Sequence, residues 1–221
     1  FAAGTRPTMI WGNLLFSCLN TTHAVTRTVV AGTGSDGKPC HRMAPGEVVA
    51  GSSVRDSMIA DANPRNQTQF LNTLTWKNFT LTALVDWRNG GYTQDDTKFI
   101  FDEGGNSRDY DAASSDPART LGQFRYGVAS AGNSSTYVDD GTYVKLREVS
   151  LSFRAPKRWA SALRASEMRV SVQGRNLAMW SRYWSFDPEF SNFGNSNFNR
   201  SEDLAPYPSS RQFLLSIDLA Y

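Results

Sequence analysis

The sequence predicts an all-β chain whose antiparallel strands form a segment of a transmembrane β-barrel. Side-chain character alternates with a period of two in several runs, these runs carry aromatic residues at their ends, and short connections alternate with long ones. Short turns on one side of a membrane and long loops on the other are typical of outer-membrane barrels. A soluble β-sandwich with insertions is the alternative interpretation.

Composition sets the limits of this interpretation. Of the 221 residues, 40% are hydrophobic and 12% aromatic, which is enough apolar material for a folded core. The longest apolar run, residues 9–16, is interrupted by Gly12 and Asn13, so no helix crosses a membrane. Lys and Arg total 23 against 21 Asp and Glu, which leaves no strong electrostatic case for a nucleic-acid partner.

The first predicted strands lie in the N-terminal half. A weak strand is expected near residues 9–17. Two stronger runs, 70–76 and 79–88, each alternate apolar and polar residues and are separated only by Lys77 and Asn78. A tight hairpin is therefore expected between them.

Two further strands are expected at 143–153 and 169–177, because apolar and polar residues alternate in both runs. The connection between them is of moderate length. Pro156 suits the first position of a helix, so one short helix is expected there.

The C-terminal run gives the clearest alternation. One face carries only apolar and aromatic side chains and is expected to face the membrane: Phe213, Leu215, Ile217, Leu219 and Tyr221. The opposite face carries Asp218. By the same parity, the polar side chains Glu148, Arg169, Arg175 and Asp218 are expected to face the lumen of the barrel, where they form ladders and plug contacts or a substrate site.

The remaining connections are long, at 20–66, 89–141 and 178–210. Unstructured loops of this length usually carry function, and here they are expected to be extracellular. About six strands are fewer than the roughly eight that a closed barrel needs. Because unpaired backbone groups are not tolerated in lipid, the chain is expected to be part of a larger barrel. The N-terminus lacks the pattern of a signal peptide, which agrees with this expectation.

Several stretches together resemble the C-terminal end of the SusC/RagA family of TonB-dependent outer-membrane transporters. They are TWKNFTLTALVDWRNGG (75–91), DGTYVKLREVSLSF (140–153), RVSVQGRNLAMWSRYWSFDPEFSNFG (169–194) and YPSSRQFLLSIDLAY (207–221). We therefore expect residues 67–221 to be C-terminal strands and loops of such a barrel. Residues 1–66, a weak strand and a long loop, match the family poorly.

This resemblance implies a barrel of about 22 strands in the bacterial outer membrane, plugged by an N-terminal domain. It implies import of glycan or peptide oligomers together with a SusD-like surface lipoprotein, powered by the TonB complex. The implied partners are the remainder of the barrel and plug, that lipoprotein, outer-membrane lipid, and TonB through an N-terminal part that this sequence does not contain. A secreted β-sandwich that binds carbohydrate and a purely structural barrel subunit are the alternative functions.

The loop after residue 178 combines flat apolar rings with amide side chains, which suits stacking on sugars or peptides. Its candidate substrate or partner residues are Trp180, Tyr183, Trp184, Phe186 and Phe190. The favoured interpretation is that these aromatics pack the loop onto itself or onto the partner lipoprotein. A turn is expected at residues 187–189 in preference to a cation site.

Metal, cofactor and catalytic sites are not expected. Acidic side chains gather in the loop 89–141 without the register of a calcium loop, so a solvated acidic loop is favoured over calcium binding. Cys18, Cys40, His23 and His41 fit no zinc spacing, and a disulfide between Cys18 and Cys40 is favoured over two free thiols. No histidine lies in the sequence context of a hydrolase triad, so no enzyme is expected.

Overall fold

The computed structural model describes residues 8–18, 32–34, 36–48, 52–131, 134–191 and 202–221. The chain forms two compact units, and each is built from several stretches of sequence. Unit 1 comprises Phe1–Pro64, Gly90–Gly141 and Tyr183–Tyr207. Unit 2 comprises Arg65–Asn89, Thr142–Arg182 and Pro208–Tyr221. Residues 67–221 thus contribute to both units.

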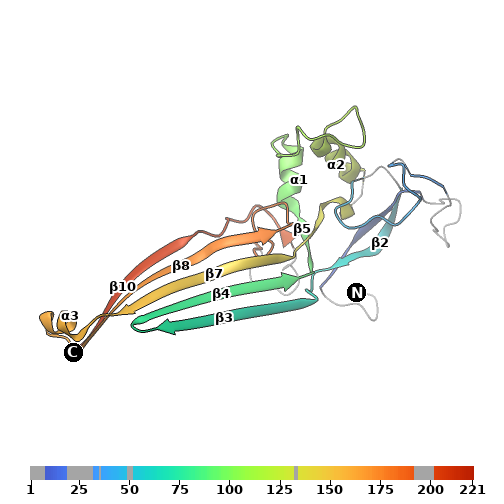
Figure 1. The fold of residues 1–221 in the computed structure, drawn as a ribbon. Coiled ribbons are helices and arrows are strands. Elements are labelled where there is room, and N and C mark those ends of the chain that lie inside the picture. Colours follow the sequence, from blue (N-terminus) through green and yellow to red (C-terminus); the bar gives the residue numbers. More distant parts are fainter. Residues whose placement is uncertain (1–7, 19–31, 35, 49–51, 132–133, 192–201) are drawn as a thin grey trace. The chain divides into compact units, whose positions relative to one another are not determined.

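Unit 2 is a five-stranded antiparallel sheet with the strand order β10-β8-β7-β4-β3 (Figure 1). Its strands are β3 (Asn66–Trp76), β4 (Phe79–Asn89), β7 (Tyr143–Arg154), β8 (Glu167–Ser181) and β10 (Gln212–Ala220). The five strands predicted from residue 70 onward are all present. The hairpin at Lys77 and Asn78 is also present, and Lys77 adopts a positive φ of 52° to close it.

Helix α3 (Lys157–Ala162) connects β7 to β8, as predicted. Pro156 is its N-cap residue, one position before the first helical residue. Proline is tolerated there because its fixed φ leads into the helix and its missing N–H is not needed.

A β-bulge at Arg147 keeps the two halves of β7 in phase. Leu146 pairs with Val85 and Val149 pairs with Ala83, so three residues of β4 are matched by four of β7. Strict alternation would place Leu146 and Val149 on opposite faces. The extra residue brings both to the same face of the sheet.

Unit 1 contains shorter elements. Strands β1 (Met9–Phe16) and β2 (Ser52–Asp61) form an antiparallel pair. A three-stranded sheet of order β6-β5-β9 combines β5 (Tyr92–Asp95), β6 (Val138–Asp140) and β9 (Glu202–Asp203). Helices α1 (Asp96–Glu103) and α2 (Leu121–Ser130) and the 3-10 turn η1 (Ser134–Tyr137) complete the unit.

The prediction of unstructured loops at 20–66, 89–141 and 178–210 was therefore wrong in its described parts. These regions contain β2, β5, α1, α2, η1, β6 and β9, and β8 extends to Ser181. Small apolar clusters hold them in place: Met43, Phe124 and Val128 form one, and Ile59, Ala60 and Val138 form another. Phe124 packs against Met43, which is far away in the sequence, so the local sequence pattern around Phe124 did not indicate that it is buried.

Cys18 and Cys40 form a disulfide. Among the helices of the described residues, none has the length and apolar character needed to cross a membrane.

Candidate functional site

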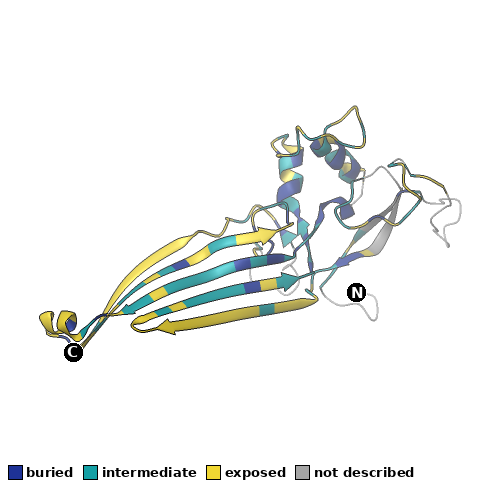
Figure 2. Ribbon diagram, viewed as in Figure 1, coloured by how far each residue is buried: buried dark blue, intermediate teal, exposed yellow. Residues whose placement is uncertain are grey.

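One face of the sheet in unit 2 is an apolar surface. Its central row runs across all five strands as Leu215, Val172, Leu151, Leu81 and Leu74. These side chains are exposed, Leu215 by 70% and Leu74 by 67%. Figure 2 shows that β3 and β10 are exposed along almost their whole length. A β-sandwich would bury such a row against a second sheet, so exposure of the row disfavours that alternative.

The predicted membrane-facing residues belong to this surface. Phe213, Leu215, Ile217 and Leu219 lie on β10 and pair in turn with Gly174, Val172, Val170 and Met168 of β8. Tyr221 follows the end of β10 and is 86% exposed. Leu219 is half-buried and the other predicted residues are exposed.

The opposite face of the sheet is polar. Glu148 lies opposite Arg175, and Arg175 Nε is 3.4 Å from Glu148 Oε2. Arg169 lies opposite Asp218. Hydroxyl pairs continue the surface, since Ser171 Oγ and Ser216 Oγ are 2.6 Å apart. The structure thus brings all the predicted polar residues to one face of the sheet.

A buried cluster on this polar face was missed by the sequence analysis. Asp86 is fully buried and accepts hydrogen bonds from Arg147, whose Nε lies 2.7 Å from Asp86 Oδ2, and from the hydroxyl of Tyr143. Lys145 Nζ lies 4.7 Å above the Tyr143 ring. Arg147 is the bulge residue, so its place here could not be read from alternation.

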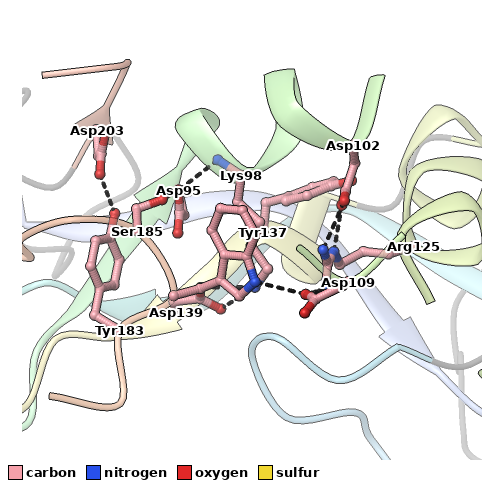
Figure 3. A network of polar contacts seen from close by, with 11 residues as sticks. Asp95, Lys98, Asp102, Asp109, Arg125, Tyr137, Asp139, Tyr183, Ser185 and Asp203 are labelled. Carbon is pink, nitrogen blue, oxygen red and sulfur yellow. Dashed lines mark hydrogen bonds and ion pairs between the residues drawn. The ribbon is translucent and has the colours of Figure 1, made fainter. Parts of the chain in front are cut away.

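Unit 1 contains a buried ion-pair network (Figure 3). Asp102 accepts from Arg125 Nε at 2.6 Å, from Arg125 Nη2 at 2.8 Å and from the Tyr137 hydroxyl at 2.8 Å. Asp109 Oδ2 accepts from Arg125 Nη1 at 2.8 Å and from the Trp184 indole at 2.7 Å. Both side chains of the Arg125–Asp102 pair are almost completely buried. The prediction of a solvated acidic loop was wrong for Asp102 and Asp109, because these carboxylates face a buried guanidinium, whereas Glu103 and Asp111 of the same loop are exposed.

Electrostatics in this network follow from burial and pairing. Burial lowers the pKa of Arg125, but the hydrogen bonds and charges of Asp102 and Asp109 outweigh burial and raise it above its usual range. For Asp109, burial raises the pKa, and the contacts with Arg125 and Trp184 outweigh burial and lower it. Burial and then the Asp102 charge raise the pKa of Tyr137, so the phenol stays protonated as a donor.

A second buried cluster joins β5, α1 and the segment after residue 182 (Figure 3). Lys98 Nζ donates to both carboxylate oxygens of Asp139 at 2.8 Å. Asp95 Oδ1 caps helix α1 by accepting from the Lys98 backbone N–H at 2.8 Å, and it also accepts from Ser185 Oγ at 2.5 Å. The Tyr183 hydroxyl donates to Asp203 Oδ2 at 2.6 Å.

Burial raises the pKa of Asp95 to about 7, although the hydrogen bonds from Ser185 and the Lys98 N–H act against it. Because the folded state binds this proton more tightly than the unfolded chain does, the free energy of unfolding should fall as pH rises from about 4 to about 7. Asp95→Asn keeps the capping oxygen and should flatten this pH dependence, which for a pKa raised from 3.8 to about 7 amounts to at most about 4 kcal/mol. Denaturant unfolding between pH 4 and pH 9 measures it.

Asp111→Asn is the matched control for that measurement, because Asp111 is exposed. Its unfolding curve should follow the wild type at every pH. An unchanged slope in Asp95→Asn would contradict the role assigned to the Asp95 proton.

The predicted loop aromatics do not form one site. Trp180 lies within β8 in unit 2 and not in a loop, which corrects the prediction, and it is 61% exposed. Tyr183 and Trp184 pack inside the networks of unit 1, where Trp184 also lies under Arg108 at 4.7 Å. Phe186 and Phe190 are exposed. The predicted turn at 187–189 is present, since Glu189 N donates to Asp187 Oδ1 at 3.0 Å.

The chain is similar in sequence to two known receptors. No family model matches the chain. It is 27% identical over 177 residues to TonB-dependent receptor P3 of Formosa agariphila, an alignment that covers 77% of this chain and 18% of that receptor. It is 30% identical over 91 residues to TonB-dependent receptor P26 of the same organism, covering 40% of this chain and 9% of that receptor. The chain is homologous to part of these TonB-dependent receptors.

Solved structures share the fold of the chain. The RagAB peptide importer in its closed-closed state matches 97% of the chain with a TM-score of 0.60 at 16% identity, and the match covers 24% of that structure's chain. The open-open state matches 95% of the chain with a TM-score of 0.55 at 13% identity, covering 22%. The antiparallel sheets therefore match part of RagA, and the predicted resemblance is confirmed at this level.

The chain spans 18% of receptor P3 and 22–24% of the RagAB chains that it matches. The receptors that the chain resembles belong to a non-enzymatic family, in line with the expectation that it is not an enzyme.

Proposed function

We propose that this chain forms the C-terminal part of the barrel wall in a SusC-like TonB-dependent importer of the outer membrane. The observation that carries the proposal is the two-faced sheet of unit 2, in which a row of exposed apolar residues backs onto a row of polar ones. Alternation of lipid-facing and lumen-facing residues is the pattern of membrane barrels. In the proposed barrel of about 22 strands, the apolar row meets lipid and the polar residues line the lumen.

In this proposal, the connections between strands lie on two different sides of the outer membrane. The hairpin turn at Lys77 and Asn78 and the helix α3 connection lie in the periplasm, and the long connections of unit 1 lie outside the cell. The buried networks of unit 1 support this assignment, because they give the long connections a fixed structure of their own.

Cysteine labelling on intact cells tests the topology. Asp111 and Asn78 are both exposed, and the chain's two cysteines are joined in a disulfide, so a single introduced cysteine reports one position. In the native polypeptide, Asp111→Cys should react with a membrane-impermeant maleimide on intact cells. Asn78→Cys should react only after the outer membrane is permeabilised. Equal labelling of both, or recovery of the polypeptide in a soluble fraction, would overturn the proposal.

The proposed activity is import of peptide or glycan oligomers with a SusD-like lipoprotein partner. Homology to TonB-dependent receptors and the match to a peptide importer support it. Uptake of labelled oligopeptides and oligosaccharides by cells with and without the gene separates the two substrate classes. If uptake of neither class changes while the barrel is present, the purely structural subunit is the correct alternative.

A further inference from the structure

Three side chains with metal-binding chemistry meet in unit 1, close in sequence to the Cys18–Cys40 disulfide. One donor atom from each of Asp36, His41 and Glu47 lies within 4.8 Å of the other two. We infer that these residues form a binding site for a divalent transition-metal ion of the Zn²⁺ type. The site is independent of the barrel wall proposed above, since none of its residues belongs to the sheet of unit 2.

Each of the three side chains is held by the backbone through one of its polar atoms. His41 Nδ1 lies 2.8 Å from the Pro39 carbonyl oxygen, Glu47 Oε2 accepts from Ala44 N at 2.9 Å, and Asp36 Oδ1 accepts from Lys38 N at 3.1 Å. Metal ligands in proteins are commonly oriented in this way, with the second polar atom of the side chain tied to the backbone or a carboxylate. The atoms left to bind an ion are His41 Nε2, Glu47 Oε1 and Asp36 Oδ2.

His41 Nδ1 lies nearer to the Pro39 carbonyl oxygen, at 2.8 Å, than to Ser17 Oγ, at 3.3 Å, and with the Nδ1 proton directed to that carbonyl the contact with Glu47 needs a positive charge between its two atoms. When Nδ1 carries its proton toward the Pro39 carbonyl, Nε2 of a neutral imidazole presents a lone pair. That lone pair faces Glu47 Oε1 at 3.0 Å, so two acceptors meet. Either a second proton or a metal ion satisfies both. Two ligands on a tetrahedral Zn²⁺ with bonds of about 2.0–2.1 Å are about 3.3 Å apart, close to the observed spacing.

Asp36 provides a second, independent indication. Its side chain is 8% exposed, and its Oδ2 is buried without a hydrogen-bond partner in the described part of the chain. The Lys38 ammonium lies 3.9 Å away on a side chain that is 67% exposed, which is a loose ion pair. A buried carboxylate oxygen without a hydrogen bond is costly, and a bound cation removes that cost.

The donor set indicates the kind of ion. Imidazole nitrogen suits Zn²⁺ and other transition metals, and carboxylates complete a three-ligand set that leaves a position for water. Ca²⁺ takes six to eight oxygen ligands and is a poor match for a histidine site. Paired Cys and His spacings, which indicate most zinc sites, are absent from the sequence, and these ligands are instead spaced as Asp-x4-His-x5-Glu.

Metal titration of the native polypeptide tests the inference. The polypeptide is purified in detergent, stripped with EDTA, dialysed and titrated with Zn²⁺ by calorimetry, and Co²⁺ is added separately to record its visible absorption. His41→Ala, Glu47→Gln and Asp36→Asn should each weaken Zn²⁺ binding at least about tenfold and reduce the Co²⁺ absorption. His23→Ala, which replaces the chain's other histidine, should bind as the wild type does.

Glu47→Gln and Asp36→Asn keep the size of the side chain, so they guard against a loss of binding through misfolding. Each variant is compared with the wild type by circular dichroism and by the mass of the oxidised Cys18–Cys40 peptide pair. Wild-type Zn²⁺ affinity in all three ligand variants would overturn the site. An equal loss in His23→Ala would also overturn it, because binding would then be nonspecific.

Discussion

Replacing Leu215 with arginine should destabilise the membrane-inserted barrel by about 2–4 kcal/mol, the cost of placing an arginine at the bilayer midplane on a lipid-facing site. Leu215 lies near the middle of β10, in an apolar row with Val172 and Leu151. Denaturant unfolding of the native polypeptide in lipid vesicles measures the loss. Reduced heat-resistant, folded protein in the outer membrane should accompany it.

The adjacent leucine is the matched control. Leu214 pairs with Gln173 in a row that continues through Ser150, Thr82 and Thr73, so its side chain lies on the polar face. Leu214→Arg introduces the same charge one residue away and should cost about 1 kcal/mol or less. If both variants lose the same stability, the assignment of the two faces to lipid and lumen is wrong.

Replacing Arg125 with methionine should destabilise unit 1 by about 3–5 kcal/mol. The substitution leaves the buried Asp102 carboxylate without its bidentate partner and frees Asp109 from the same guanidinium. Hydrogen–deuterium exchange of peptides from α1 and α2 measures the effect locally, and both helices should exchange much faster than in the wild type.

Two variants separate charge burial from other causes. Arg119→Met breaks a partly exposed pair with Asp116 and a contact with the Phe124 ring at 4.9 Å, and should cost about 1 kcal/mol or less. Adding Asp102→Leu to Arg125→Met removes the stranded charge and should recover part of the loss. Equal exchange rates in Arg125→Met and Arg119→Met would contradict a structural role for the buried pair.

Sequence alternation was sufficient to predict the sheet, because every second side chain of a strand faces the same surface. The runs 79–88 and 213–221 alternate over most of their length, so their strands could be assigned without a structure. Alternation fails at Arg147, where one inserted residue shifts the parity of β7. A bulge leaves no simple mark in a single sequence, and so the cluster around Asp86 stayed hidden.

The weak strand expected near residues 9–17 is present as β1, but the other described elements of unit 1 were missed for a different reason. Helices α1 and α2 bury charged residues, and a local pattern of charges indicates a solvated loop. Asp102 and Arg125 are 23 residues apart, and nothing in the sequence joins them. Capping gave a local indication that could have been used: Asp95 precedes α1 as a side-chain cap, and Thr120 N donates to Gln123 Oε1 at the start of α2.

The sheet of unit 2 has consequences for how the polypeptide is made. Its outer strands β3 and β10 each pair with one neighbour among the described strands, which leaves a row of backbone N–H and C=O groups on each outer side. Such rows are templates for pairing with any extended chain. In the proposed barrel, the two edges must therefore be kept from one another, and from other nascent chains, until they pair with the adjoining strands. We therefore expect this region to depend on chaperones and to self-associate before it is inserted into the membrane.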